Sequence, residues 1–319
     1  MKQILLIGNG AREHVIAEAI KKSPQETHLV VLGKSVNPAL KELSDRYEVG
    51  DILDPVLAVK LAHEEKVDFA IIGPEAPIEA GVTDALMEAE IPSMAPLQSV
   101  GRLETSKSFT RDLLAKHNIV GNPRFEVFYD DKDLEGLLDE LGDNYVVKAD
   151  GLMGGKGVKV SGDHLHSHEE ALKYAKDCLD ELGKVVIEEK LVGQEFSLMS
   201  FCDGVTNVFM PVIQDHKRAF EGDKGPNTGG MGSYTCEDHS MPFITPEDVE
   251  EAKEMTNQVA AALYNETGMQ YKGIMYGGFI ATKDGVRLIE YNARFGDPEA
   301  MNVLPLLRSD FVNICEKVI

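Results

Sequence analysis

The sequence lacks tryptophan, has only four cysteines, and contains no apolar run near the roughly 20 residues that a membrane-spanning helix needs. The cysteines are scattered without a C-x-x-C pair, so they indicate buried thiols and neither a disulfide framework nor a zinc site. No signal-peptide pattern precedes the apolar N-terminal segment. These absences predict a soluble, cytoplasmic protein that makes no contact with a membrane.

Basic residues are also scarce. The chain has 32 lysines and arginines against 54 aspartates and glutamates, a formal net charge of -22, which disfavours binding to nucleic acid. Basic side chains near glycine-rich segments therefore stand out, at Lys148 and Lys156, at Lys217 and Arg218, and at Arg294. Their positions predict an anionic small-molecule ligand.

The length of 319 residues suggests two or three domains, and the first hundred residues alternate strand and helix patterns. Apolar runs at 4–7, 29–32 and 69–72 predict buried strands of a parallel sheet covered by helices. The turn Gly8-Asn9-Gly10 follows the first strand and opens a helix. Because helix N-termini at the carboxyl edge of such a sheet favour phosphate, this turn is a candidate anion site.

The same turn does not match a dinucleotide-binding fingerprint. Glu13 stands where a third glycine is needed, and Gly33-Lys34 stand where an acid should close the second strand. Glu75, in the Gly-Pro-Glu-Ala-Pro segment after the strand at 69–72, is placed to contact a sugar hydroxyl. The alternative is that this segment forms only a rigid turn.

A second α+β region follows the helix expected from the Ser106 cap to His117. Within it, residues 146–158 predict a strand, a glycine-rich loop and a second strand, with Lys148 and Lys156 beside the loop. Free backbone N–H groups and two ammonium groups would form a phosphate cradle. No hydroxyl follows the lysine, so this is not a P-loop, and the alternative is a flexible hairpin turn.

The strand expected at 185–191 carries Glu188 near its end, and Glu195 begins the next strand. One interpretation is a hinge that contacts the edge of a base, with an acid that accepts from ribose hydroxyls. The alternative is that both acids are solvated strand ends.

The segment at 288–299 predicts the metal site. Glu290 and Asn292 lie two residues apart on one face of a short strand, and their oxygens suit a magnesium ion between nucleotide phosphates. Arg294 is expected on the same side. The alternative is an edge strand with a solvated polar face. Three histidines at 164, 166 and 168 are interpreted as a polar loop and not as a metal site.

Residues 214–218 and 225–232 combine charges of both signs with a glycine-rich turn. They suit a zwitterionic ligand whose amine meets Asp215 and whose carboxylate meets a cation. A polar surface loop is the competing interpretation.

In this order the segments resemble the phosphoribosylamine-glycine ligase family of the ATP-grasp superfamily. The motifs that carry the resemblance cover nearly the whole chain: Gly-Asn-Gly-Ala-Arg-Glu-His at 8–14, Gly-Pro-Glu-Ala-Pro at 73–77, Lys-Ala-Asp-Gly at 148–151, Gln-Asp-His-Lys-Arg at 214–218, Gly-Pro-Asn-Thr-Gly-Gly-Met-Gly at 225–232 and Asn-Ala-Arg-Phe-Gly-Asp-Pro-Glu at 292–299. The block at 214–232 distinguishes this family from other ATP-grasp enzymes.

The resemblance implies a multidomain α/β and α+β fold. A Rossmann-like substrate domain at 1–104 would precede a two-lobed ATP-grasp domain at 105–319, whose mobile lobe spans about 121–192. The family continues into a C-terminal β-rich domain, whereas this chain ends at Ile319 in an apparent helix, so that domain is expected to be absent and full activity is in question.

The resemblance also implies roles for individual residues. Magnesium or manganese would be held by Glu290 and Asn292. Catalysis would depend on Arg294, Lys217 and Asp215. ATP would contact Lys107, Lys148, Gly151, Gly154, Gly155, Lys156, Gly157, Glu188, Glu189, Leu191 and Glu195. The substrates would contact Gly8, Asn9, Gly10, Arg12, Glu13, Pro74, Glu75, Arg218, Asn227, Thr228, Gly229 and Gly230.

The implied reaction joins glycine to 5-phosphoribosylamine through glycyl phosphate, in purine biosynthesis, by a monomeric enzyme. Three positions depart from the family pattern: Ala11 replaces a common glycine, the loop at 32–37 lacks a usual Pro-Gly-Asn, and Gly277 replaces an acid found in many relatives. The metal shell would then be completed by phosphates, water or another residue. Another ATP-grasp ligase and a nucleotide-binding regulatory module are the rival hypotheses.

Overall fold

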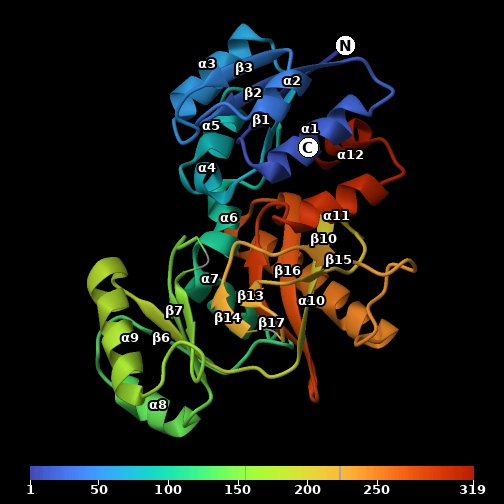
Figure 1. Ribbon diagram of the computed structural model, residues 1–319. Helices are drawn as coiled ribbons and strands as arrows, with labels where there is room; N and C mark the ends of the chain where they lie inside the picture. Colours follow the sequence, from blue (N-terminus) through green and yellow to red (C-terminus); the bar gives the residue numbers. More distant parts are fainter. Residues whose placement is uncertain (155, 223) are drawn as a thin grey trace.

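The computed structural model describes residues 1–154, 156–222 and 224–319 (Figure 1). Its N-terminal unit is a parallel sheet of order β3-β2-β1-β4-β5. The elements are β1 (Lys2–Ile7), α1 (Ala11–Lys21), β2 (Thr27–Gly33), α2 (Pro38–Leu43), β3 (Arg46–Val49), α3 (Pro55–Glu64), β4 (Phe69–Ile72), α4 (Glu75–Glu79), α5 (Val82–Glu88) and β5 (Ser93–Met94). The predicted parallel sheet is confirmed.

The apolar run of β1 explains its central place in this sheet. Ile4, Leu5, Leu6 and Ile7 have no exposed surface, because β2 and β4 flank the strand and helices cover both faces. The strand order reverses between β1 and β4, so the turns that follow these two strands lie side by side at the carboxyl edge. Open α/β sheets bind ligands at such a switch point.

Two helices connect this unit to the rest of the chain, α6 (Gln98–Thr105) and α7 (Lys107–Lys116). Ser106 separates them and caps α7, since its hydroxyl accepts the backbone N–H of Phe109. The helix predicted after this cap is confirmed.

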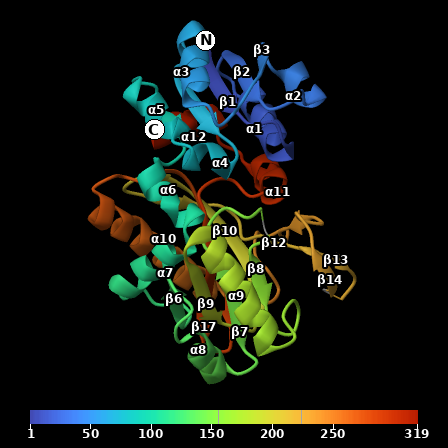
Figure 2. The same cartoon turned by 90° about the vertical axis from the view of Figure 1, so that its left-hand side faces the viewer.

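A small lobe follows, built on an antiparallel sheet of order β6-β9-β7-β8 (Figure 2). Its elements are β6 (Phe125–Phe128), α8 (Leu134–Leu141), β7 (Tyr145–Ala149), β8 (Val158–Val160), α9 (His168–Leu182) and β9 (Val185–Glu189). The predicted strand, glycine-rich loop and strand are confirmed, because β7 pairs with β8 across the loop. The mobility expected of 121–192 stays a prediction.

The large lobe has a second antiparallel sheet, of order β11-β10-β16-β17. Its elements are β10 (Gln194–Asp203), β11 (Asn207–Phe209), β12 (Gln214–Asp215), β13 (Arg218–Phe220), β14 (Lys224–Asn227), β15 (Ser233–Tyr234), α10 (Pro246–Thr267), β16 (Lys272–Thr282) and β17 (Gly285–Asn292). The short pairs β12-β15 and β13-β14 extend from the sheet as a separate arm.

The chain then returns to the N-terminal unit through α11 (Glu299–Leu306) and α12 (Phe311–Val318), which lie beside α1 in Figure 1. One buried cluster includes Ile4 and Ile16 of the first unit, Phe201 of β10 and Phe311 of α12. The units predicted as 1–104 and 105–319 therefore share a continuous core, and the exact division between them stays a prediction. Across the described residues, no helix is both long and apolar enough to span a membrane.

Candidate active site

The two lobes are joined at their facing edges by a buried ionic cluster. Glu188 of β9 accepts from Lys148 of β7 at 2.8 Å and from Arg111 of α7 at 2.6 and 2.9 Å. Burial alone would raise the pKa of Glu188, but Arg111 and Lys148 outweigh it and lower the pKa. Glu188 is thus held ionised by the two cations beside it. Burial lowers the pKa of Lys148, and one carboxylate against two cations leaves an excess of positive charge in the cluster.

A β-bulge in β17 completes this cluster. The pairing of β16 with β17 shifts register between Gly278 and Phe279, which leaves Ile289 as an extra residue. Its carbonyl oxygen accepts from Lys148 Nζ at 3.0 Å and from Arg111 Nη2 at 2.7 Å. The bulge therefore directs one backbone oxygen of the large lobe at one cation of the small lobe and one of the connecting helix α7.

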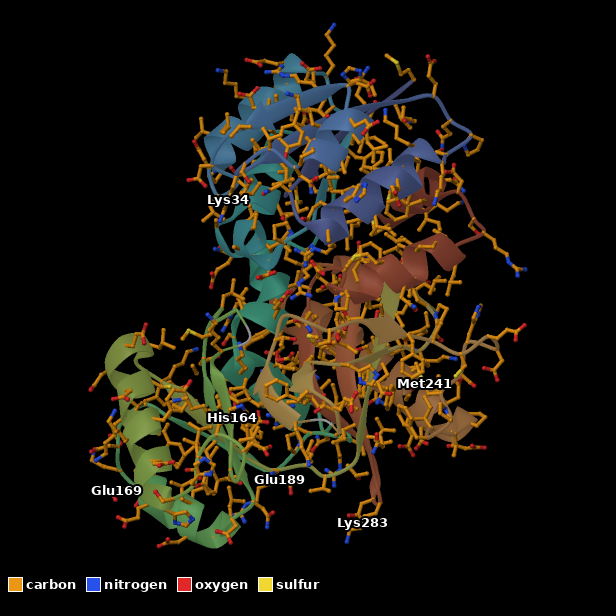
Figure 3. The ribbon with its side chains drawn as sticks, viewed as in Figure 1. Lys34, His164, Glu169, Glu189, Met241 and Lys283 are labelled. Atoms are coloured by element: carbon orange, nitrogen blue, oxygen red, sulfur yellow. The ribbon has the colours of Figure 1, made fainter. Side chains whose placement is uncertain are left out.

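These contacts limit which residues of the hinge predicted at 185–191 are free to contact a ligand. The backbone of β9 at Glu188 pairs with β6 on one side and β7 on the other, and the Glu188 side chain pairs with Arg111 and Lys148. Neither the backbone nor the side chain of Glu188 is therefore directed at a base. Glu189, labelled in Figure 3, accepts the backbone N–H of Arg124 at 2.8 Å. Leu191 follows the end of β9, outside both ladders, and remains the position from which the hinge could contact adenine.

The glycine-rich loop is held at both ends. Lys107 Nζ donates to the carbonyl of Gly151 at 2.6 Å, and Tyr174 of α9 donates to the carbonyl of Gly157 at 3.1 Å. Gly154 has a φ of 55°, which favours glycine, and Lys156 is exposed. Gly155 lies outside the described residues.

The predicted metal ligands lie beyond the bulge. Glu290 and Asn292 are both partly buried and pair with Gly278 and Tyr276 of β16. Burial would raise the pKa of Glu290, but Lys217, Lys148, Lys107 and Arg294 together lower it. An ionised carboxylate beside an amide oxygen fits a hard divalent cation. Within the described residues no group of three or more His, Cys, Asp or Glu forms a metal site, so a cation held by Glu290 and Asn292 would need further ligands from elsewhere.

A small cavity of about 20 Å³ adjoins Glu290. Its polar lining comes from Glu195, Ser197, Asp215, Lys217, Tyr276 and Glu290. Burial would lower the pKa of Lys217, but Glu290, Glu195, Asp215 and Glu299 raise it. The cavity is therefore a charged pocket with one ammonium group among several carboxylates.

Asp215 is unusual within this pocket. Burial, and then the neighbouring Glu299, raise its pKa to about 6. Its Oδ1 atom is buried and has no hydrogen-bond partner among the described residues. Glu299 is itself 2% exposed and accepts from the Tyr276 hydroxyl, which also contacts Ser197 at 2.8 Å. A cationic ligand would supply the partner that Asp215 Oδ1 lacks.

The remaining predicted residues of this arm are occupied by structural contacts. Arg218 pairs with Asp163 of the small lobe at 3.1 Å and donates to the Gly225 carbonyl at 2.9 Å. The Thr228 hydroxyl donates to the Lys217 carbonyl at 2.9 Å. Gly229 is exposed, and the Asn227 side chain lies outside the described residues.

Gly230 requires the absence of a side chain. Its φ is 119°, and a Cβ atom there would lie 2.6 Å from Pro298 and 3.3 Å from Asp215 Oδ1. The glycine-rich turn therefore passes directly over the unpartnered carboxylate.

Glu13 occupies the switch point of the N-terminal sheet. Its carboxylate accepts the Gly10 N–H at 2.6 Å and Arg12 Nε at 2.7 Å. A Cβ atom at Gly8 would lie 2.7 Å from the Glu13 side chain, and one at Gly73 would lie 2.1 Å from it. The three glycines thus leave space for the acid that breaks the dinucleotide fingerprint.

Two further contacts arrange the same edge. Asn9 donates to the Ser35 hydroxyl at 3.0 Å and accepts the Lys34 N–H at 3.2 Å, which ties the first turn to the loop after β2. Arg12 donates to the Phe295 carbonyl at 3.1 Å. Pro74 stands beside Gly8 as the N-cap residue of α4.

Arg294, two residues after Asn292, links this edge to α6. Its Nε atom lies 3.3 Å from Glu75, and its Nη2 atom lies 3.1 Å from Glu104 of α6. Sequence reasoning missed Glu104, Arg111 and Glu299. Arg111 carries a usable signal, because it lies four residues after Lys107 and so on the same helix face. The other two are acids without a local pattern.

Two family models match this chain. The N domain of phosphoribosylglycinamide synthetase matches residues 2–104, and its ATP-grasp (A) domain matches residues 105–300. The chain belongs to the phosphoribosylglycinamide synthetase family. The predicted family and its two-part architecture are confirmed.

Individual members of the phosphoribosylglycinamide synthetase family agree over the whole chain. A phosphoribosylamine–glycine ligase of Methanosarcina barkeri is 47% identical over 317 residues, which cover 99% of this chain and 73% of that relative. A phosphoribosylamine–glycine ligase of Pyrococcus furiosus is 48% identical, with 100% and 72% covered.

Solved structures agree with the fold. The phosphoribosylamine–glycine ligase of Thermotoga maritima superposes with a TM-score of 0.80 at 29% identity, covering 99% of this chain and 75% of that one. The D-alanine–D-alanine ligase of Bacillus anthracis, complexed with ATP, has a TM-score of 0.69 at 15% identity, with 100% and 97% covered. That more distant likeness shows the shared fold alone.

Proposed function

We propose that this protein joins glycine to 5-phosphoribosylamine at the expense of ATP, giving glycinamide ribonucleotide, ADP and phosphate, a step of purine biosynthesis. One observation carries the proposal. Glu290 lines the cavity that holds Asp215 and Lys217, and it also lies within the field of Lys148 and Lys107. The proposed phosphate site and the proposed amino-acid site would therefore meet at this carboxylate. The names of the relatives above support this choice of substrates.

The nucleotide would lie between the lobes. Lys107, Lys148 and the loop at 151–157 would contact its phosphates, Leu191 its base and Glu195 its ribose. Lys148 is already desolvated at 4% exposure, so its charge would act through a weakly screening environment.

Glu290 and Asn292 would hold a divalent cation. Two oxygen ligands with phosphates and water completing the shell suit magnesium, and manganese would also fit. When bound, the ion would neutralise charge on the transferring phosphoryl group.

Glycine would bind among the residues that line the small cavity, which at about 20 Å³ would have to widen to admit it. Its ammonium group would meet Asp215 Oδ1, and its carboxylate would lie near Lys217, which stays protonated among four acids. A carboxylate oxygen then attacks the γ-phosphorus of ATP and ADP departs, which gives glycyl phosphate. This step replaces the oxide of the carboxylate, which is a poor leaving group, with phosphate, which is a better one.

Phosphoribosylamine would approach from the N-terminal edge, beside Gly8 to Gly10, Arg12, Glu13, Pro74 and Glu75. Its amine attacks the acyl carbon and forms the C–N bond. The bond between the acyl carbon and the phosphate oxygen then breaks, phosphate departs, and the nitrogen loses a proton. Arg294 lies between this edge and β17 and would stabilise the developing oxyanion. No covalent bond to the protein is needed.

A coupled assay of ADP release tests the function. We expect turnover only when glycine and phosphoribosylamine are both present with magnesium and ATP. Turnover with a different acceptor and no response to glycine would favour another ATP-grasp ligase. Nucleotide binding without turnover under all substrate combinations would favour a regulatory module.

The oligomeric state and the cellular location stay predictions. We expect a monomer, because the proposed site draws all its residues from one chain. Light scattering of the purified protein measures this directly, and a dimer whose dissociation abolishes turnover would contradict it.

A further inference from the structure

Glu104 is a buried acid to which the proposed mechanism gives no role. It is 8% exposed and lies next to the last residue of α6, where the N-terminal unit passes into the ATP-grasp domain. Burial raises its pKa. A carboxylate at such a position is stabilising only when both oxygens are well partnered.

Both oxygens are partnered, and by neighbouring residues of one segment. Oε2 accepts the backbone N–H of Ala293 at 2.7 Å, and Oε1 lies 3.1 Å from Arg294 Nη2. Ala293 is the residue between Asn292 and Arg294. One carboxylate therefore fixes the backbone after the proposed metal ligand and the guanidinium of the proposed catalytic residue.

Arg294 needs such a restraint. Its guanidinium stands at the end of a long flexible side chain, and ordering that chain costs conformational entropy that would otherwise oppose the reaction. Glu75 restrains its Nε atom at 3.3 Å, but Glu75 is itself a proposed substrate contact. The Phe295 carbonyl accepts from Nη1 at 3.2 Å, and Glu104 holds Nη2. Glu104 is shielded from solvent, so its contact with Arg294 persists when substrates enter.

We propose that Glu104 is a positioning residue for Arg294, and that through it α6 aligns the N-terminal substrate edge with the end of β17. The inference rests on the proposed function. It adds a residue that acts through Arg294 and does not touch the reacting atoms.

The first test is a double-mutant cycle. Glu104→Gln keeps an oxygen that can accept the Ala293 N–H but places an NH₂ group against Arg294. We expect kcat to fall by about 10- to 100-fold, while the KM for ATP changes by less than about 3-fold. In an Arg294→Met background the same substitution should cost less than about 3-fold, because no cation remains there for Glu104 to position.

A structural role for Glu104 predicts a different result. If Glu104 only tethered α6 to β17, Glu104→Gln would lower kcat equally in both backgrounds, or would raise the KM for ATP as much as it lowers kcat. Either outcome, or an unchanged kcat, would overturn the proposal. Glu251→Gln is the matched control, because Glu251 accepts the Val286 N–H at 3.0 Å near the start of the same strand. It should leave kcat unchanged.

A second measurement does not depend on turnover. The guanidinium N–H resonances of Arg294, assigned by their loss in Arg294→Lys, should be protected from solvent exchange in the native protein and lose protection in Glu104→Gln. Unaltered protection would overturn the proposal. If the native protein fails to ligate glycine, the proposed function fails, and this measurement still decides whether Glu104 holds Arg294.

Discussion

At the residue scale, the account depends most on Arg294. This side chain is the one cation within the described residues that contacts both Glu75 of the N-terminal edge and Glu104 of the connecting helix. Its place between the N-terminal edge and the end of β17 is the reason to propose that it stabilises the oxyanion.

Arg294→Ala should therefore separate binding from chemistry. We expect turnover to fall by about 100- to 1000-fold, as is typical when one oxyanion donor is lost, with magnesium-ATP affinity nearly unchanged. Steady-state kinetics and calorimetry measure the two quantities. Turnover within a few-fold of the native value would remove Arg294 from the mechanism.

Asp215 connects function to pH. Its pKa of about 6 exceeds the value of about 3.9 expected in the unfolded chain. Between these pH values the folded state binds more protons than the unfolded state, so the free energy of unfolding falls as the pH rises through this window. Above pH 6 the ionised carboxylate lowers stability by its full amount.

Asp215→Asn should consequently raise the melting temperature at pH 7 to 8, by about 2–4 °C for each kcal/mol recovered, and make no difference below about pH 4. The same substitution should raise the KM for glycine, since the amide carries no charge. Thermal melts across this pH range check the first effect. A stabilisation that is equal at pH 4 and pH 8 would contradict the assignment of the pKa.

At the scale of elements, the bulge in β17 turns a backbone carbonyl toward two cations, and the strand pattern of the sequence does not predict this. Ile289 is an apolar residue in an apolar segment, and the sequence gives no reason to expect its carbonyl to face Lys148 and Arg111. The sequence does predict the strand and the shared face of Glu290 and Asn292, because a two-residue spacing is a local pattern. It cannot predict the bulge, because the register depends on β16.

The ionic cluster at this bulge gives a stability prediction. Glu188→Ala would leave Lys148 and Arg111 buried without their acid, and we expect a loss of about 3–5 kcal/mol in the free energy of unfolding. Glu140→Ala is the control, because Glu140 pairs with Arg124 at an exposed site and should cost less than about 1 kcal/mol. Denaturant titrations of both variants compare them, and equal losses would show that the cluster is not a buried charge network.

The turn after β4 gives a second stability prediction. In Gly73→Ala the new Cβ atom would lie 2.1 Å from the Glu13 carboxylate, so we expect a lower melting temperature and a higher KM for phosphoribosylamine. Gly136→Ala is the control, because Gly136 lies within α8 with no atom near its would-be Cβ. It should stabilise the protein by about 0.5–1 kcal/mol. A Gly73→Ala variant as stable as native would mean that Glu13 does not fill that space.

At the scale of the whole molecule, the proposed site draws on distant stretches of chain: the first turn, the turn after β4, α6 and α7, the loop between β7 and β8, the segment at 191–195, the arm at 214–232, and the end of β17. Glycine-rich and charged motifs indicate the chemistry of a ligand, which is why the sequence proposes the loop at 151–157, Asp215 and Glu290 as site residues. Glu104 and Glu299 could not be predicted, because their partners are remote in sequence and a buried acid has no pattern of its own. The return of α11 and α12 to α1 was hidden for the same reason, since an amphipathic helix does not specify the face that it covers.

The central claim is that one chain activates glycine as an acyl phosphate and then transfers it to an amine. The most direct test supplies glycine labelled with oxygen-18 in its carboxylate, together with phosphoribosylamine, magnesium and ATP, and measures the label in the released phosphate by phosphorus NMR. The account predicts one labelled oxygen in each phosphate, because a carboxylate oxygen leaves with the phosphoryl group. Phosphate that carries no label would contradict it.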